Sequence, residues 1–160
     1  MRITIAAIGR MKNGPERELV NRYLDRAVAA GKPLSLAGFT VSEFPESRAS
    51  GSAARKTDEA KLLRNAASGS VVVALDERGT TIGSDAFANQ IRRWRDDGRP
   101  AASFLIGGAD GLDPELVGEA DLVLSFSPLT WPHQLVRIML AEQLYRTTTI
   151  LSGHPYHRGD

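Results

Sequence analysis

Three short segments hold residues that could bind a ligand, and each follows an apolar stretch. They are LDERG (75–79), GGADG (107–111) and FSPLTW (126–131). Glycines directly after a buried strand let the backbone approach a ligand and adopt positive φ angles. G-G-x-x-G is not the G-x-G-x-x-G dinucleotide fingerprint, and the chain has no G-x-x-x-x-G-K-[ST] phosphate loop. Taken alone, the glycine cluster fits a tight structural turn as well as a ligand loop.

The closing segment SGHPYHRGD (152–160) holds two of the three histidines, His154 and His157. A metal site there would need a third ligand, such as His133 or a carboxylate, so we expect no metal. The chain has no cysteine, which excludes disulfides and thiolate zinc sites. No nucleophile–base pair of the G-x-S-x-G type is present. By residue types alone, the segment could be a frayed end or part of a working site.

Apolar stretches that alternate with helical patterns position these segments. We expect strands at 2–9, 34–44, 69–79, 102–112 and 120–130, and helices at 14–31, 52–68, 84–98 and 133–150. Strands alternating with helices predict an α/β fold with a mainly parallel sheet. Ligands of such sheets bind at the carboxyl ends of the strands, so the three segments should form one site. At 160 residues, the chain is expected to be one domain, 1–160, with a sizeable core.

Composition and charge set limits on the function. No stretch approaches the roughly 20 apolar residues of a membrane span, and the opening MRITIAAIGRMK lacks a signal-peptide pattern, so we expect a cytoplasmic protein. Residues 1–66 contain 12 Lys and Arg against 7 Asp and Glu, whereas residues 67–160 contain 8 against 12. The basic first half is compatible with a polyanionic partner, although a solvated helix surface is the simpler explanation.

Several motifs together resemble the RlmH family. They are LDERG followed by SDAFA, then FLIGGADGL, LTWPHQLVRIMLAEQLYR and HPYH, in this order. That family methylates N3 of a pseudouridine in 23S ribosomal RNA, with S-adenosylmethionine as methyl donor. The resemblance covers essentially the whole chain. It implies a SPOUT fold with a C-terminal trefoil knot, a homodimer, and assembled ribosomes as substrate, with no membrane or DNA partner. Nothing in the periodicity indicates a knot, and topology rules argue against one.

The resemblance also assigns cofactor contacts, and they fall in the same three segments. The implied residues are Leu75, Gly107, Phe126, Ser127, Pro128, Leu129, Thr130 and Trp131. Leu75, Leu129 and Trp131 can line an apolar pocket for adenine. Gly107 is expected to leave room for the ligand where a Cβ would intrude. Trp131 departs from the smaller aliphatic residue or Phe expected there, so it either narrows the pocket or packs outside it.

Methyl transfer from a sulfonium is an in-line displacement, and the weakly acidic N3–H of pseudouridine must lose its proton. We hypothesise that Tyr156 and His157 face the substrate, with His157 as proton acceptor and Arg158 on RNA phosphate. Arg137 is expected to orient the substrate or the tail. His133 is a candidate substrate contact, although it also fits a plain helix start.

Two further residue predictions concern the tail. His154 is expected to be a solvated residue without a role in the site. Gly159 and Asp160 extend past the family's usual YHR ending, and we expect no consequence from them.

Two other functions remain open at this point. One is another SPOUT or Rossmann-like enzyme with a different RNA or nucleotide target, which would bind the same cofactor but not methylate ribosomes. The other is a non-enzymatic ribosome-binding protein, which would bind ribosomes without affinity for S-adenosylmethionine.

Overall fold

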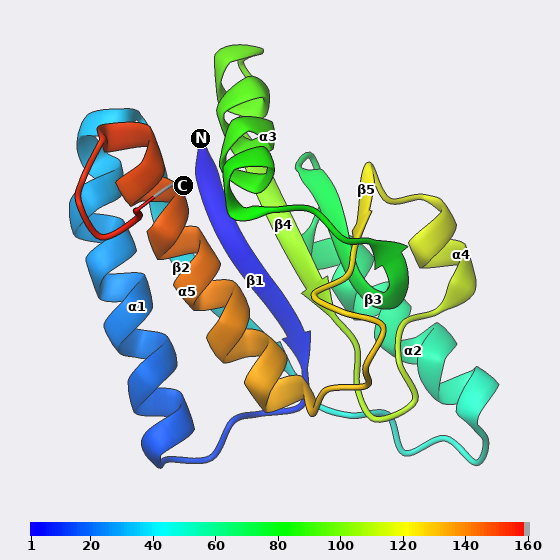
Figure 1. The fold of residues 1–160 in the computed structure, drawn as a ribbon. Coiled ribbons are helices and arrows are strands. Elements are labelled where there is room, and N and C mark those ends of the chain that lie inside the picture. The colour runs from blue at the N-terminus through cyan, green and yellow to red at the C-terminus, as the bar shows by residue number, and fades with distance from the viewer. Residues whose placement is uncertain (159–160) are drawn as a thin grey trace.

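The computed structural model describes residues 1–158, so Gly159 and Asp160 lie outside the described part. Those 158 residues form a five-stranded sheet in the order β2-β1-β4-β3-β5, with every neighbouring pair parallel (Figure 1). The strands are β1 (Arg2–Ile8), β2 (Ala37–Phe44), β3 (Val71–Thr80), β4 (Ala101–Ile106) and β5 (Leu122–Leu124). The predicted α/β class with a parallel sheet is confirmed.

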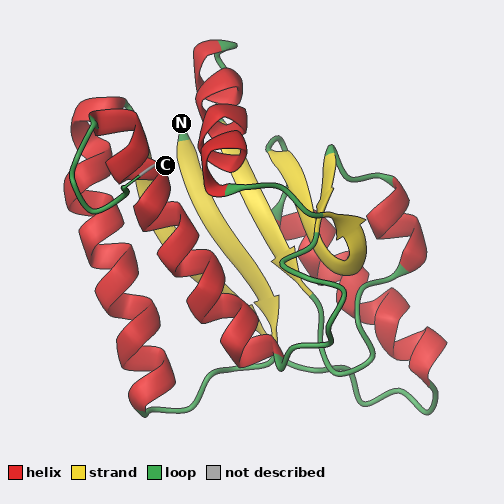
Figure 2. Ribbon diagram, in the orientation of Figure 1, coloured by secondary structure: helices red, strands yellow, loops and turns green. Residues whose placement is uncertain are grey.

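Helices cover both faces of the sheet (Figure 2). One face packs against α1 (Pro15–Gly31), α3 (Ser84–Asp96) and α5 (His133–Ser152), and the other against α2 (Ser52–Ala66) and α4 (Pro114–Gly118). The alternation of strand side chains explains the two layers, because successive residues point to opposite faces. In β1, Ile3 and Ile5 belong to the cluster under α1 and α5, whereas Ala6 and Ile8 belong to the cluster under α2.

Some predicted boundaries were wrong. The second strand was expected to begin at Leu34, but Leu34 ends a short 3-10 helix (η1, Lys32–Leu34). Ser35 then adopts a left-handed φ of 58°, and β2 begins at Ala37. The fourth predicted strand ends at Ile106 rather than 112, and the fifth spans only Leu122–Leu124. Helix α4 was not predicted, although Asp113 caps it by accepting the N–H groups of Glu115 and Leu116.

Strand β3 bends away from the sheet at its carboxyl end. It pairs with β5 up to Leu75, leaves the register, and pairs again at Thr80 opposite Leu124. A Cβ on Gly79 would lie 2.7 Å from the Val123 carbonyl oxygen, so this close approach needs glycine. The bend brings polar residues 76–78 to the end of β5. The trefoil knot itself stays a prediction.

Candidate functional site

A cavity of about 800 Å³ opens where β4, β3 and β5 end. These strands are neighbours in the sheet, so the segments that follow them meet at one edge. The cavity is lined by residues 75–78, by residues 106–112, by residues 124–133 other than 128, and by Lys56 of α2 and Val136 of α5. The volume is in the range of small-molecule and cofactor sites.

The structure brings most of the predicted cofactor residues together around this cavity. Seven of the eight line it: Leu75, Gly107, Phe126, Ser127, Leu129, Thr130 and Trp131. Pro128 is exposed and does not line it. The contact of each residue with a cofactor stays a prediction.

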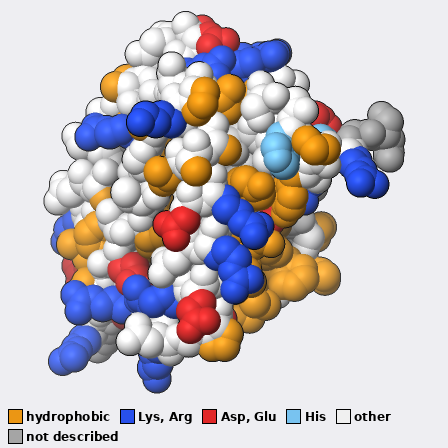
Figure 3. Space-filling view, turned by 90° about the vertical axis from the view of Figure 1, so that its left-hand side faces the viewer, with side chains coloured by type: hydrophobic (Ala, Val, Ile, Leu, Met, Phe, Trp, Pro, Cys, Tyr) orange, Lys and Arg blue, Asp and Glu red, His pale blue; other side chains and the backbone are white. Residues whose placement is uncertain are grey.

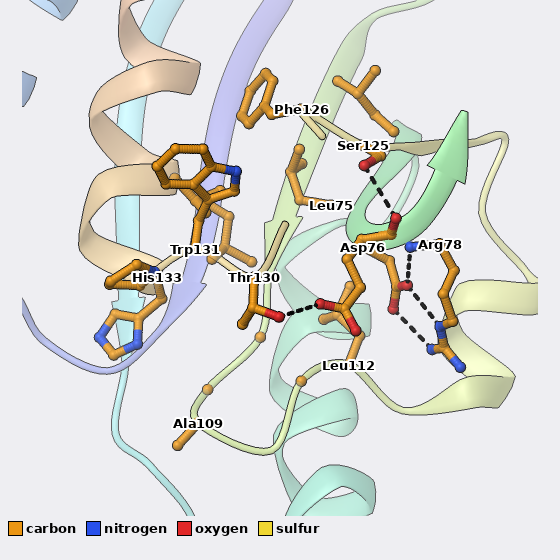
Figure 4. A pocket seen from close by; sticks show the side chains of 18 of the residues that line it. Leu75, Asp76, Arg78, Ala109, Leu112, Ser125, Phe126, Thr130, Trp131 and His133 are labelled. Atoms are coloured by element: carbon orange, nitrogen blue, oxygen red, sulfur yellow. Dashed lines mark hydrogen bonds and ion pairs between the residues drawn. The ribbon is translucent and has the colours of Figure 1, made fainter. Parts of the chain in front are cut away.

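The segment between β5 and α5 is shaped by its own hydrogen bonds. Ser127 Oγ accepts from the backbone N–H of Leu129 and from the indole Nε1 of Trp131, both at 3.0 Å. Thr130 Oγ1 donates to Glu77 Oε2 at 2.8 Å, which ties this segment to the bend of β3. Trp131 therefore stands in the cavity wall rather than packing outside it (Figure 4).

Gly107 is required for the packing of its own loop. A Cβ at this position would lie 2.6 Å from the Gly111 carbonyl carbon and 2.8 Å from the Leu112 nitrogen. Such distances are too short for any side chain, so glycine is needed for the loop to close on itself. Gly107 also lines the cavity, and its expected role in making room for a ligand stays a prediction.

Ion pairs hold two of the three carboxylates of the cavity wall. Asp110, in the glycine loop, accepts from Arg55 of α2 at 2.6 and 3.1 Å, which anchors the loop to that helix. Asp76 accepts from the Arg78 guanidinium at 2.9 and 3.0 Å. The hydrogen bond from Arg78, against the opposing effect of burial, holds the pKa of Asp76 below its ordinary value. The third wall carboxylate, Glu77, accepts the hydroxyl of Thr130.

The cavity has an apolar side and a charged side. Figure 4 shows Phe126 and Trp131 on one side, near α5, and Asp76 and Arg78 on the other, at the bend of β3. Leu75 lies between them. This division suits a ligand with an aromatic ring at one end and charged groups at the other.

Arg137 lies behind the cavity rather than in its wall. Its side chain is 1% exposed. It donates to Glu43 Oε1 at 2.6 Å and to the carbonyl oxygens of Ile8 and Gly9 at 3.0 and 2.7 Å. These bonds fix the first turns of α5 against the ends of β1 and β2. Arg137 contacts neither the cavity nor the tail among residues 1–158, so its predicted orienting role can act only through other groups.

Glu43 is the charged partner that makes this burial possible. It also accepts the Met11 backbone N–H at 2.8 Å and pairs with Arg17 at 2.9 Å. Burial by itself would raise the pKa of Glu43, but the Met11 N–H bond and the two arginines outweigh it and lower the pKa. Burial lowers the pKa of Arg137, and Glu43 offsets part of this effect.

His133 is half-buried and lines the cavity at the first turn of α5. Its Nε2 lies 3.6 Å from the position that a Cβ on Gly9 would take. The histidine therefore sits between the end of β1 and the cavity, where a substrate contact is geometrically possible. That contact stays a prediction.

The tail folds back on α5. The Tyr156 hydroxyl donates to Glu142 Oε1 at 3.1 Å, and its ring centroid lies 4.8 Å from that of Tyr145. The Arg146 guanidinium lies 5.0 Å from the same ring. Burial, followed by the bond to Glu142, raises the pKa of Tyr156 to about 12. The phenol thus stays protonated and acts as a hydrogen-bond donor.

His157 is held between two charged side chains. Its Nδ1 lies 3.3 Å from Arg146 Nη1, and its Nε2 lies 3.3 Å from Asp85 Oδ2 at the start of α3. Because a guanidinium can only donate, Nδ1 must be the acceptor and the proton must be on Nε2. His157 can therefore take up a further proton only after Arg146 has turned away from it.

Two further predicted tail residues, His154 and Arg158, are exposed. His154 is solvated as expected, and its Nδ1 accepts the Tyr156 backbone N–H at 3.1 Å, which shapes the turn. Arg158 is the last described residue and is open to solvent.

The tail and the cavity lie at opposite ends of α5 (Figure 1). His133 begins the helix at the cavity, and Arg146, which contacts the tail, follows 13 residues later. At about 1.5 Å per residue, this is a separation of roughly 20 Å. Within residues 1–158, no residue of the tail lines the cavity.

Residues 1–158 contain no group of three or more His, Asp or Glu side chains placed to hold a metal ion. Nor does any helix in that part have the length and apolar character needed to cross a membrane.

Comparison with known proteins decides the family. The model of a family described as predicted SPOUT methyltransferase matches residues 1–157. The chain belongs to this family. Curated relatives of this SPOUT methyltransferase include two named Ribosomal RNA large subunit methyltransferase H, from Brucella anthropi and from a Bradyrhizobium species. Each is 55% identical over 159 residues, which is 99% of this chain and 99% of the relative.

Solved structures agree with the fold. A probable methylase family protein from Haemophilus influenzae has a TM-score of 0.53 at 13% identity, covering 99% of this chain and 70% of that one. A probable methyltransferase from Bordetella pertussis has a TM-score of 0.51 at 12% identity, covering 91% of this chain and 95% of that one. At such low identities these structures support the fold alone.

Sequence reasoning missed several residues around the site. Lys56 and Arg55 lie on a helix whose polar residues all look solvated in the sequence, and no motif marks them. Glu43, the partner of Arg137, lies 94 positions away in the chain. Asp85 was within the quoted SDAFA motif, but its contact with the tail had no signal.

Proposed function

We propose that this SPOUT methyltransferase transfers a methyl group from S-adenosylmethionine to N3 of a pseudouridine in 23S ribosomal RNA. The observation that carries the proposal is the near full-length identity to relatives named Ribosomal RNA large subunit methyltransferase H. The substrate is the large subunit within assembled ribosomes, and the protein works in the cytoplasm, where ribosomes are. It needs no metal, membrane or DNA partner. Family membership favours this enzyme over a non-enzymatic ribosome-binding protein.

The residues of the cavity fit the cofactor. S-adenosylmethionine supplies an electrophilic methyl group on a positively charged sulfur. Leu75, Phe126 and Trp131 offer apolar surface for adenine, and residues 126–131 offer backbone donors and acceptors. The charged side of the cavity suits the amino-acid end of the molecule. His133 at the rim is placed to contact the substrate base.

The tail supplies the groups that face the base. The N3 proton has to leave as the new N–C bond forms, which calls for a proton acceptor or a cation that stabilises the developing anion. His157 takes the proton at Nδ1 once Arg146 has released that nitrogen. Tyr156 stays a hydrogen-bond donor, and Arg158 binds RNA phosphate.

A homodimer is needed to combine the two regions, because one chain holds its tail roughly 20 Å from its cavity along α5. We propose that the tail of one copy serves the cavity of the other. Three large apolar side chains near the cavity are exposed: Leu129 (65%), Trp131 (40%) and Leu135 (41%). On the face that carries α1, Figure 3 shows hydrophobic side chains gathered toward one edge, with Lys and Arg spread over the rest. Such apolar surface is suited to burial by a second copy.

The proposal is tested with ribosomes from a strain that lacks its own pseudouridine-N3 methyltransferase. Purified protein, S-adenosylmethionine and either assembled ribosomes or free large subunits are incubated, and the 23S RNA is digested and analysed by mass spectrometry. We expect N3-methylpseudouridine at one position, with assembled ribosomes as the better substrate. Cofactor turnover without this product would contradict the target, and preference for free subunits would contradict the assembled substrate.

A further inference from the structure

We infer that Lys56 and Glu77 recognise the amino-acid end of the cofactor. The Lys56 ammonium binds the α-carboxylate, and the Glu77 carboxylate binds the α-ammonium group. The inference rests on the proposed use of S-adenosylmethionine and assigns two cofactor-binding residues in addition to those already considered.

Some of the charged side chains around the cavity are paired with one another and others are not. Two arginines near the cavity already have carboxylate partners: Arg78 pairs with Asp76, and Arg55 pairs with Asp110. Lys56 lines the cavity and forms no ion pair within residues 1–158. Glu77 lines it too, and its hydrogen-bond partner there is the neutral hydroxyl of Thr130. The charge of Lys56 acts at longer range on Asp76 and Asp110, and that of Glu77 acts on Arg78. Lys56 and Glu77 are thus the cation and the anion of the wall that have no close ion pair among the described residues and can pair directly with a ligand.

Lys56 and Glu77 reach the cavity from two different elements. Glu77 lies in the bend of β3, beside Asp76, on the charged side of the cavity. Lys56 comes from α2, one residue after the arginine that anchors the glycine loop. A cation and an anion on two different elements can each contact one of the two opposite charges of an α-amino acid. Adenine, at the other end of the cofactor, is left to the apolar side near α5.

The strength of the two contacts depends on the charge and on the solvent exposure of each side chain. Charged hydrogen bonds are stronger than neutral ones, and solvent screens the half-buried Lys56 less than the exposed Glu77. Removal of either charge should lower the binding affinity of a ligand that carries the amino-acid end. The affinity of a ligand that lacks this end should not change.

The experiment uses three ligands with the full-length protein in isothermal titration calorimetry. S-adenosylmethionine and S-adenosylhomocysteine both carry the amino-acid end, whereas methylthioadenosine lacks it. Lys56→Met keeps the apolar stem of the side chain, and Glu77→Gln keeps an acceptor for Thr130. We expect each variant to lose roughly five- to tenfold in affinity for the first two ligands and less than twofold for methylthioadenosine.

Matched controls are Lys61→Met on the same helix and Glu115→Gln on α4, whose side chains are 65% and 86% exposed. Both should bind all three ligands as the unmodified protein does. An equal loss for methylthioadenosine would overturn the inference, and so would unchanged affinity for S-adenosylmethionine. A loss in Glu77→Gln for S-adenosylmethionine but not S-adenosylhomocysteine would place Glu77 at the sulfonium and overturn its assignment. If the unmodified protein binds none of the three, the proposed function itself fails.

Discussion

The two ends of α5 are built in different ways. At its beginning, the cavity is formed by backbone: three strands end at one edge of the sheet, and the loops close on themselves through groups such as Gly107 and Ser127. At its end, the tail is held by side chains of α5 and α3, through Glu142, Arg146 and Asp85. The sheet therefore fixes the cavity, whereas the tail depends on a few polar contacts that can be exchanged.

This difference suggests a division of labour. A preformed cavity suits a cofactor, which has the same shape at every turnover. A tail held by exchangeable hydrogen bonds suits a large substrate, because it can readjust when RNA arrives. His157 illustrates this, since it can accept a proton only after Arg146 leaves its Nδ1.

Deletion of residues 156–160 tests most directly whether the cavity binds the cofactor and the tail serves the substrate. It should have the largest effect on methylation. The cavity remains complete, so the dissociation constant for S-adenosylmethionine should stay within about twofold. Methylation should fall by roughly a thousandfold, because the groups facing the base are gone. Turnover is measured by mass spectrometry of 23S RNA and affinity by calorimetry. Undiminished turnover would mean that the tail has no part in catalysis.

Mixing two defective chains tests whether the regions belong to different copies. One chain carries the tail deletion, and the other carries Gly107→Val, which forces a Cβ into the Gly111 and Leu112 backbone and should disrupt the cavity. After co-refolding in equal amounts, roughly a quarter of the sites should combine an intact cavity with an intact tail from the other copy. No recovery of methylation above either chain alone would contradict the shared site.

Two arginines of α5 allow the stability of its two ends to be compared. Arg137→Met should lower the free energy of unfolding by roughly 2–4 kcal/mol, because a buried pair is broken and the Ile8 and Gly9 carbonyls lose their donor. Arg146→Met, nearer the tail and partly exposed, should cost less than about 1 kcal/mol. Urea unfolding followed by circular dichroism measures both. Equal losses would mean that the two ends of α5 are held equally firmly.

The same contrast explains what the sequence could predict. The three ligand segments were predictable because strand patterns are local and the carboxyl edge of a parallel sheet gathers the loops. The ion pair that anchors the glycine loop was not predictable, because Arg55 and Asp110 are 55 positions apart in the sequence. The packing of Gly107 within its own loop was not predictable either, since a glycine that makes room for a ligand and one that lets its loop close look alike in a sequence.

The tail was predictable as a source of chemistry but not as a structure. Its residue types suggested proton transfer, yet the partner of Tyr156 lies 14 positions away and that of His157 72 positions away. Such contacts depend on how α3 and α5 pack, which no local pattern specifies. Helix α4 differs, because Asp113, followed by Pro114 at the first helical position, is a recognisable start signal that was overlooked.

The pKa of Tyr156 provides the finest test of how firmly the tail is docked. Burial and Glu142 raise this pKa to about 12 from an ordinary value of 10, so the protonated phenol is favoured in the folded state. Docking should therefore be fully retained below pH 10 and weaken as the pH rises toward 12. Tyrosinate absorbance after a rapid pH jump, compared with Tyr156→Phe, should reveal one group with a midpoint near 12. Glu142→Gln should lower that midpoint in part, because burial remains. A midpoint at 10 in the unmodified protein would mean that the tail is undocked in solution, and His157 would then need no release from Arg146.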